Sequence, residues 1–160
     1  MFKSNKGVTL VALVITIIVL LILAGVSISL IAGPNGVLTK SKKAAKDTDI
    51  ANVKDAFELA VAGVAVEYQD DSITNLSLTA GNYFTYARIK ANLDGYQICS
   101  ATSTTEETTG KLEVSTDASS KSTIYLCKKG ATSGATIYKV EYLMSDAPAF
   151  SGIVVTPVEE

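Results

Sequence analysis

The feature that most constrains this chain is an uncharged apolar stretch close to its N-terminus. Residues 8–32 read VTLVALVITIIVLLILAGVSISLIA, and their only polar side chains are hydroxyls that can hydrogen bond to a helix backbone. As a helix this stretch extends roughly 37 Å, more than the ~30 Å hydrocarbon core of a bilayer. A secretory signal has a shorter apolar core, of about 7–15 residues. We therefore predict a single membrane-spanning helix.

Lysines flank this helix on both sides, so charge alone does not orient it. Lys3 and Lys6 precede it, and four lysines follow it at positions 40, 42, 43 and 46. The positive-inside rule, taken alone, favours a cytoplasmic C-terminus. A pair of cysteines and a Thr/Ser-rich C-terminal region favour an exported domain instead. We predict an extracellular C-terminal domain, with the lysines against anionic headgroups or the acids of neighbouring subunits.

The composition argues against several classes of function. The chain has no histidine, so it lacks the commonest general base at neutral pH and the commonest metal ligand. Fourteen basic and sixteen acidic residues give a net charge of -2, and nothing in their distribution predicts nucleic-acid binding. No nucleophile elbow, phosphate-binding loop or zinc signature occurs, and the adjacent acids Asp70 and Asp71 have no convergent partners. We predict no enzymatic activity, no cofactor and no metal.

Cys99 and Cys127 are the only cysteines. In a small exported domain an even pair predicts one disulfide. It would close a loop of roughly 29 residues and stabilise the domain by about 3–4 kcal/mol. The alternative is two unpaired, buried thiols that act as small hydrophobic side chains.

A short basic leader that ends in glycine stands directly before the apolar helix. The junction, residues 6–11, reads KGVTLV and resembles the processing site of type IV prepilins. In that family a membrane peptidase cuts after the glycine and methylates the new N-terminus, so the resemblance implies cleavage between Gly7 and Val8. Glycine lets the scissile bond unwind into a protease cleft without a side chain in the way. The resemblance covers the leader, the apolar helix and the helix that follows.

Two positions depart from the pattern of the family. The first mature residue is usually aromatic or Met but here is Val8, and the fifth is usually Glu but here is Ala12. The family's carboxylate neutralises the N-terminal amine of an adjacent subunit, and an unpaired charge in hydrocarbon is costly. Either the hydroxyl of Thr9 or Thr16 or a helix carbonyl solvates the amine here, or this is a specialised subunit such as a minor or tip pilin.

Small residues recur every four positions from the second half of the apolar stretch to the residue just after it. They are Gly25, Ser29 and Gly33. This spacing lets helix backbones approach closely in lipid, so we predict a helix-packing stripe.

The sequence GPNG then interrupts the helical pattern. Pro34 removes a backbone donor, and Gly33 and Gly36 permit left-handed or unwound conformations. We predict a hinge at Gly33, Pro34 and Gly36. It either separates two helices only or also lets the stem bend and stretch in a filament.

A second helix is predicted for residues 37–69, with one apolar stripe facing a sheet. The stripe consists of Ala45, Ile50, Val53, Phe57, Ala60, Val61 and Val64. Beyond it, residues 83–93 predict a short helix, and 129–134 predict a hairpin turn. We expect strands at 96–101, 112–115, 123–128, 136–143 and 152–156, and an exposed polar loop at 100–110.

The predicted fold class is α+β, a long N-terminal helix with a membrane half and an amphipathic half packed on a small antiparallel β-sheet. The segments are a leader (1–7), a transmembrane or filament-core helix (8–32), a hinge (33–36), an amphipathic helix (37–69) and a β-rich domain (70–160).

The predicted function is that of a structural subunit of a type IV pilus or a pseudopilus-like surface filament. Its expected partners are membrane lipid, prepilin peptidase and copies of itself or other pilins. The alternative is a membrane-anchored extracellular binding module that never polymerises.

Overall fold

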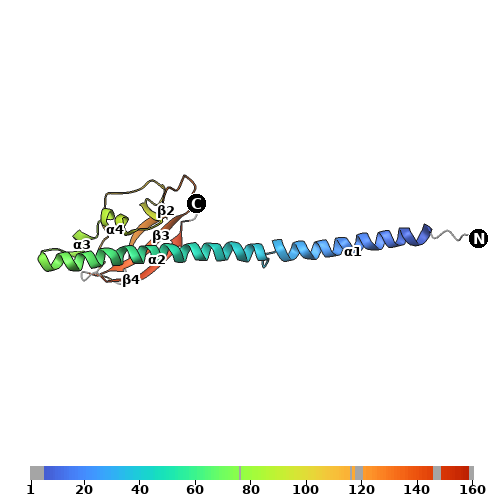
Figure 1. Ribbon diagram of the computed structural model, residues 1–160, viewed down its shortest axis with the longest axis horizontal. Helices are drawn as coiled ribbons and strands as arrows, with labels where there is room; N and C mark the ends of the chain where they lie inside the picture. Colours follow the sequence, from blue (N-terminus) through green and yellow to red (C-terminus); the bar gives the residue numbers. More distant parts are fainter. Residues whose placement is uncertain (1–5, 76, 116, 118–120, 146–148, 159–160) are drawn as a thin grey trace, which may run out of the picture. The chain divides into compact units, whose positions relative to one another are not determined.

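The computed structural model describes residues 6–75, 77–115, 117, 121–145 and 149–158, with the backbone alone for residues 6–9. Two long helices come first, α1 (Lys6–Ala32) and α2 (Val37–Thr74) (Figure 1). The chain divides into two compact units, Met1–Asp47 and Thr48–Glu160, and the division falls within α2.

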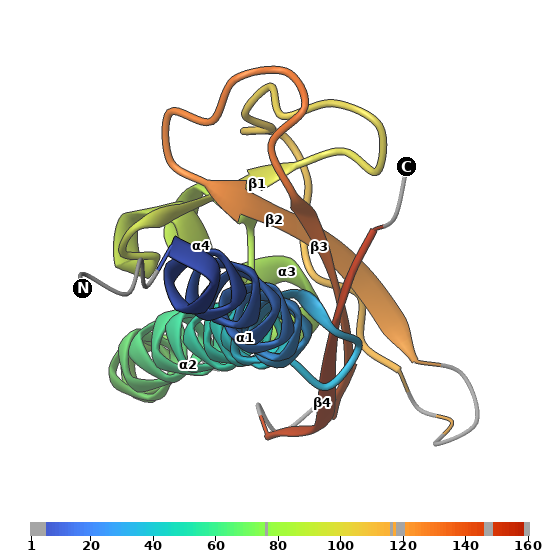
Figure 2. The ribbon, with the colours of Figure 1, turned by 90° about the vertical axis from the view of Figure 1, so that its right-hand side faces the viewer.

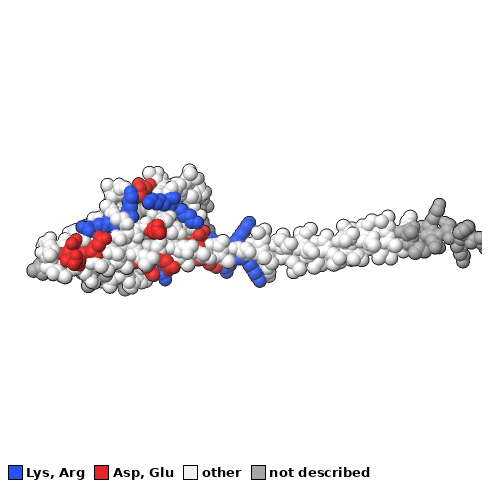
Figure 3. Space-filling model, in the orientation of Figure 1, with Lys and Arg blue, Asp and Glu red and all other residues white. Residues whose placement is uncertain are grey.

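The first unit contains α1, which is apolar on every side. Between Leu10 and Ile31, sixteen large hydrophobic side chains are 46% to 67% exposed, and Figure 3 shows this stretch without charge. The hydroxyls of Thr16 and Ser27 donate to the carbonyls of Leu13 and Leu23, both at 2.8 Å. For these two residues, the expected hydrogen bond from the hydroxyl to the helix backbone is confirmed. Among the described residues, one helix is long and apolar enough to span a membrane, and it lies near the N-terminus.

The second unit is built on a four-stranded antiparallel sheet. Its strands are β1 (Tyr96–Cys99), β2 (Ser122–Lys128), β3 (Ile137–Met144) and β4 (Phe150–Pro157), and they neighbour one another in chain order. Figure 2 shows α2 on one side of these strands. The predicted α+β class, a long N-terminal helix with a small antiparallel sheet, is confirmed.

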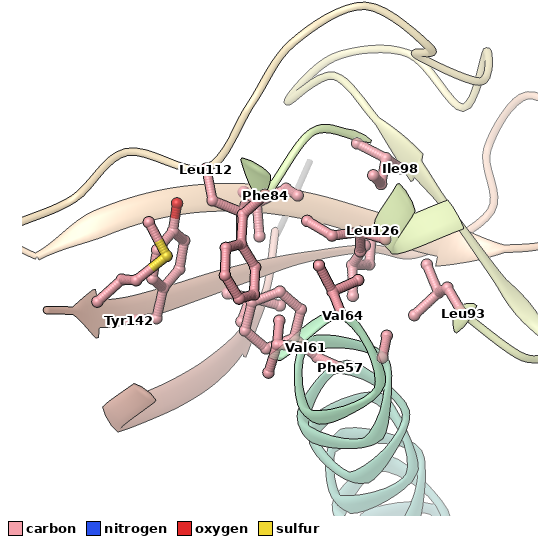
Figure 4. Close-up of a cluster of buried hydrophobic side chains, with 14 of the residues drawn as sticks. Phe57, Val61, Val64, Phe84, Leu93, Ile98, Leu112, Leu126 and Tyr142 are labelled. Carbon is pink, nitrogen blue, oxygen red and sulfur yellow. The ribbon is translucent and has the colours of Figure 1, made fainter. Parts of the chain in front are cut away.

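The predicted apolar stripe of α2 forms the helical half of the core. Val53, Phe57, Ala60, Val61 and Val64 are buried and Ile50 is half-buried, whereas Ala45 is exposed in the first unit. In Figure 4 the labelled side chains of α2 point toward those of the sheet. Steps of three and four residues placed them on one side of the helix, and burial of that side holds α2 on the sheet.

The sheet half of the core follows from the alternation in β3. Tyr138, Val140, Tyr142 and Met144 are buried, and the residues between them are half-buried. Register pairs Val140 with Ile124 of β2 and with Val155 of β4, so one face of the sheet is continuous across three strands. The predicted hairpin turn is also present, because Gly130 and Gly134 have φ of 74° and 85° in the β2–β3 connection.

Two helical boundaries differ from the prediction. The second helix continues to Thr74 rather than ending at residue 69, so Asp70 and Asp71 are helical. The hydroxyl of Tyr83 donates to Asp71, and this tertiary contact outweighs the weak helix propensity of aspartate. The predicted helix 83–93 is helical only over α4 (Tyr86–Asn92), while Tyr83 ends a separate short helix, α3 (Ala80–Tyr83). The chain turns at Phe84 between them, and both Tyr83 and Phe84 are buried.

Residues 112–115 do not form a strand of the sheet. The amide of Leu112 donates to the carbonyl of Phe84 at 2.7 Å, and that of Ser115 donates to Met144 at 3.0 Å. A single bridge joins Lys111 to Thr85. The segment therefore runs from the turn at Phe84 to the end of β3 without joining the sheet. Its apolar leucine made it resemble a strand in the sequence.

We predict that Phe57→Ala destabilises the second unit by about 3–5 kcal/mol, as expected for truncating a buried aromatic side chain. Phe57 is fully buried, and its ring centroid lies 5.6 Å from that of Tyr142 and 6.2 Å from that of Phe150. Thermal unfolding of the full chain in detergent micelles, followed by tyrosine near-UV circular dichroism, measures the loss.

The matched control is Leu59→Ala on the same helix, since Leu59 is 72% exposed. It should change the unfolding free energy by less than about 0.5 kcal/mol. Equal losses in the two variants would contradict the assignment of the buried face.

Candidate functional site

The predicted processing junction lies in the first turn of α1. Gly7 and Val8 both have helical backbone, and the leader residues 1–5 lie outside the described residues. A peptidase that takes the Gly7–Val8 bond into its cleft must first unwind this turn. Glycine is about 1 kcal/mol less favourable than alanine inside a helix, so the turn at Gly7 is easier to open.

Two of the three predicted packing residues lie on an open side of α1. Gly25 and Ser29 are exposed, whereas Gly33 follows the last residue of the helix and is half-buried. No heavy atom lies within 4 Å of the position that a Cβ on Gly25 would take. A second helix could therefore approach the backbone closely here, and the packing role itself stays a prediction.

The predicted hinge is a hydrogen-bonded turn between α1 and α2. The amide of Gly36 donates to the carbonyl of Gly33 at 2.7 Å, with Pro34 and Asn35 at the two central positions. Asn35 has a negative φ, which fits a type I turn with proline at its preferred position. The Gly33 carbonyl also accepts the hydroxyl of Thr39 at 3.2 Å. The break is thus a defined, hydrogen-bonded turn.

The two glycines of this turn are needed for a different reason from the one the sequence suggested. Neither has a positive φ, so left-handed backbone is not used. A Cβ on Gly33 would lie 2.5 Å from the carbonyl oxygen of Ser29, and one on Gly36 would overlap the carbonyl oxygen of Ile31. Close approach of the backbone therefore excludes a side chain at both positions.

We predict that Gly36→Ala loosens the turn. The added methyl would also lie 2.8 Å from the Gly33 oxygen that accepts the position-36 amide. Amide hydrogen exchange at positions 36 and 40 should accelerate at least about tenfold, the factor that ~1.4 kcal/mol produces in a local opening equilibrium. Exchange of the full chain in micelles measures it.

Gly25→Ala is the control for this change, because it adds the same methyl where no atom is near. Its exchange should stay the same or slow, since alanine is the better helix former. A turn that exchanges no faster in Gly36→Ala than in Gly25→Ala would refute the steric account.

The two cysteines lie side by side on the face of the sheet that is turned away from the hydrophobic core. Cys99 pairs with Tyr125 and Cys127 pairs with Gln97 across β1 and β2, so the thiols are diagonal neighbours. Both are free cysteines in this structure, and they are 2% and 0% exposed. Burial, followed by contact with Cys127, raises the pKa of the Cys99 thiol. The geometry brings the pair together as expected, and the bond itself stays a prediction.

The polar loop after β1 is mostly exposed, as expected, but part of it also covers this pair. The carbonyl of Thr104 accepts the side-chain amide of Gln97 at 2.8 Å and the thiol of Cys127 at 3.6 Å. Farther along, the amide of Glu107 donates to the Ile98 carbonyl at 2.8 Å. The loop has few apolar residues, so hydrophobicity gave no sign that it folds back on the sheet.

For the cysteine pair we predict that unreduced, exported protein has no free thiol. Labelling must be done in denaturant, because native burial would hide free thiols as well. Mass spectrometry should find no label without reductant and two labels after reduction. Two labels on the unreduced chain would remove the disulfide.

A cluster around Arg88, the only arginine of the chain, went unnoticed in the sequence. Its guanidinium lies 3.8 Å above the Tyr83 ring and donates to the Tyr83 hydroxyl at 2.7 Å and to Glu67 at 3.4 Å. Burial and the hydrogen bond to Asp71 raise the pKa of Tyr83 to about 12, although the positive charge of Arg88 opposes this shift. The cluster ties α4 to the end of α2, and its members are too far apart in sequence to form a motif.

Other polar groups of this unit also serve the fold. Lys128 of β2 pairs with Asp49 of α2 at 3.2 Å, and Lys90 pairs with Glu106 at 3.0 Å. Within the described part of the chain, no three His, Cys, Asp or Glu side chains converge on a possible metal position. A hollow of about 500 Å³ between the β2–β3 connection and residues 101–102 offers hydroxyls and backbone groups.

Comparisons with protein-family models, with curated protein sequences and with solved structures each yield no match. The likeness to type IV prepilins therefore rests on the N-terminal residues alone.

Proposed function

We propose that this chain is a structural subunit of a type IV pilus or pseudopilus-like filament, processed between Gly7 and Val8. The observation that carries the proposal is that α1 is apolar on every side and follows directly on a basic leader ending in glycine. The C-terminal unit is then displayed outside the cell, first from the membrane and later from the filament surface.

The energetics of α1 support an environment of lipid or of like helices. Sixteen half-exposed large apolar side chains would cost on the order of 20 kcal/mol in water. Lipid and a bundle of identical helices remove this cost about equally, so exchange of one for the other has little hydrophobic driving force. Close packing at Gly25, Ser29 and Gly33 would supply the preference for protein neighbours.

Ala12 is the feature that favours the alternative, a membrane-anchored module that keeps its leader and never polymerises. It offers no carboxylate to a neighbouring N-terminal amine. The hydroxyl of Thr16 donates to Leu13 and keeps its lone pairs, so it can still accept from an ammonium group. Under the filament proposal this hydroxyl, that of Thr9 or a helix carbonyl solvates the amine.

The mass of the mature N-terminus separates the two functions. We predict loss of residues 1–7 (MFKSNKG) and addition of one methyl group to Val8, read by mass spectrometry of the chain purified from membranes or sheared filaments. An intact leader would favour the anchored module.

Gly7→Glu should block processing and surface assembly but leave membrane insertion intact, because the large charged side chain obstructs the scissile bond. Gly7→Ala, which adds one methyl and no charge, is the matched control and should retain more processing. Normal filaments from Gly7→Glu would count against the proposed function.

A further inference from the structure

A second apolar stripe runs along α2 on the side that the core does not use. Leu59, Val66 and Ile73 recur at seven-residue steps and are 72%, 69% and 79% exposed. We call this side the outer face. Steps of four, three, four, four and three residues place six exposed residues on it: Asp55, Leu59, Ala62, Val66, Asp70 and Ile73.

The fold gives these side chains no role. A large apolar residue at this exposure every second turn is typical of a helix that packs against a partner. Ala62 also lines a groove of about 490 Å³ beside β4, together with Glu58, Val61, Ala65, Phe150 and Ile153. The outer face therefore continues into a groove that is apolar except for Glu58.

The charge around the outer face indicates what kind of partner fits it. Residues 48–74 of α2 contain six carboxylates and one lysine. Asp55 and Asp70 lie on the outer face itself, and neither joins any salt bridge between described residues. A complementary partner is a helix that carries exposed apolar side chains and several cations.

Such a helix is present in the first unit of the same chain. The first turns of α2, residues 37–46, have four lysines and no acid, and we call them the lysine segment. Figure 3 shows lysines next to the uncharged stretch. Val37 and Leu38 of this segment are 68% and 51% exposed, so it also brings apolar surface.

We propose that the outer face of α2 in one copy binds the lysine segment of a second copy. The proposal rests on the proposed function, which gathers many copies in one membrane and one filament. Pairing of two outer faces is less favourable, because Asp55 and Asp70 of both copies would then meet like charges. Anionic headgroups compete for the same lysines, so docking would strengthen as subunits leave the bilayer.

Photocrosslinking of the full chain in its own membranes tests this. p-Benzoylphenylalanine replaces Val66, and cells moved from ¹⁴N to ¹⁵N medium during expression hold both kinds of copy in one membrane and provide mixed-isotope products. Crosslinks should map to residues 37–46 of the other copy. The same probe at Thr123, exposed on β2, is the control and should give none there.

Charge reversal adds a readout of specificity. Asp55→Lys with Asp70→Lys should lower the crosslink yield at least fivefold, as should Lys42→Glu with Lys43→Glu. Expressing the two reversed chains together should restore the yield between them. Asp94→Lys with Glu113→Lys, which changes the charge equally at exposed sites elsewhere, should leave it unchanged.

Each other outcome overturns the docking. Crosslinks to lipid, to α1 or to the outer face of another copy would identify a different occupant, as would products of a single isotope only. The mature mass, read on the same sample, keeps the two proposals apart. Crosslinks at 37–46 with an intact leader would refute the filament but support docking, whereas processed filaments without them would refute docking alone.

Discussion

The structure depends on one constraint, that α1 has no polar side. A helix that is apolar all round cannot lie on the surface of a soluble domain, where one side would stay in water. Residues 10–32 therefore stay exposed along α1, and within the described chain the hydrophobic core begins at Val53. This explains why one helix, four short strands and two short helices must provide all the packing of the second unit.

Because so few elements form the core of the second unit, α2 must pack on the sheet with one side while its other side stays exposed. Its inner face supplies five buried side chains to the core, and its outer face carries three large apolar residues that no other described residue covers. Charge is divided along the helix as well, with lysines in its first turns and carboxylates after them. The inner side of α2 is therefore fully packed within the domain, whereas its outer side leaves large apolar side chains exposed.

The sequence predicted the parts of the fold that periodicity controls. The inner stripe of α2 from Val53 to Val64 and the alternation in β3 are where they were expected, because one period of burial sets each. Contacts between distant residues were beyond its reach. Tyr83 holds Asp71 in a helix, and Phe84 captures Leu112 outside the sheet.

The candidate site divides in the same way. Gly7, Gly25 and the turn at 33–36 were visible because each is a local pattern, and the reason for the glycines of the turn became clear only from the carbonyls that crowd them. The outer face of α2 also has a simple period. The sequence did not single it out, because the longer apolar stripe on the inner side of the same helix already explained how α2 packs on the sheet.

The loop that covers the cysteines has a consequence for the order of events during folding. With Thr104 seated over Gln97 and Cys127, neither thiol is open to an oxidising enzyme once the domain has folded. A bond between them would have to form while the chain is still emerging, before the loop closes. The pair would then keep the redox state set by the compartment in which the domain folded, whatever environment it meets later.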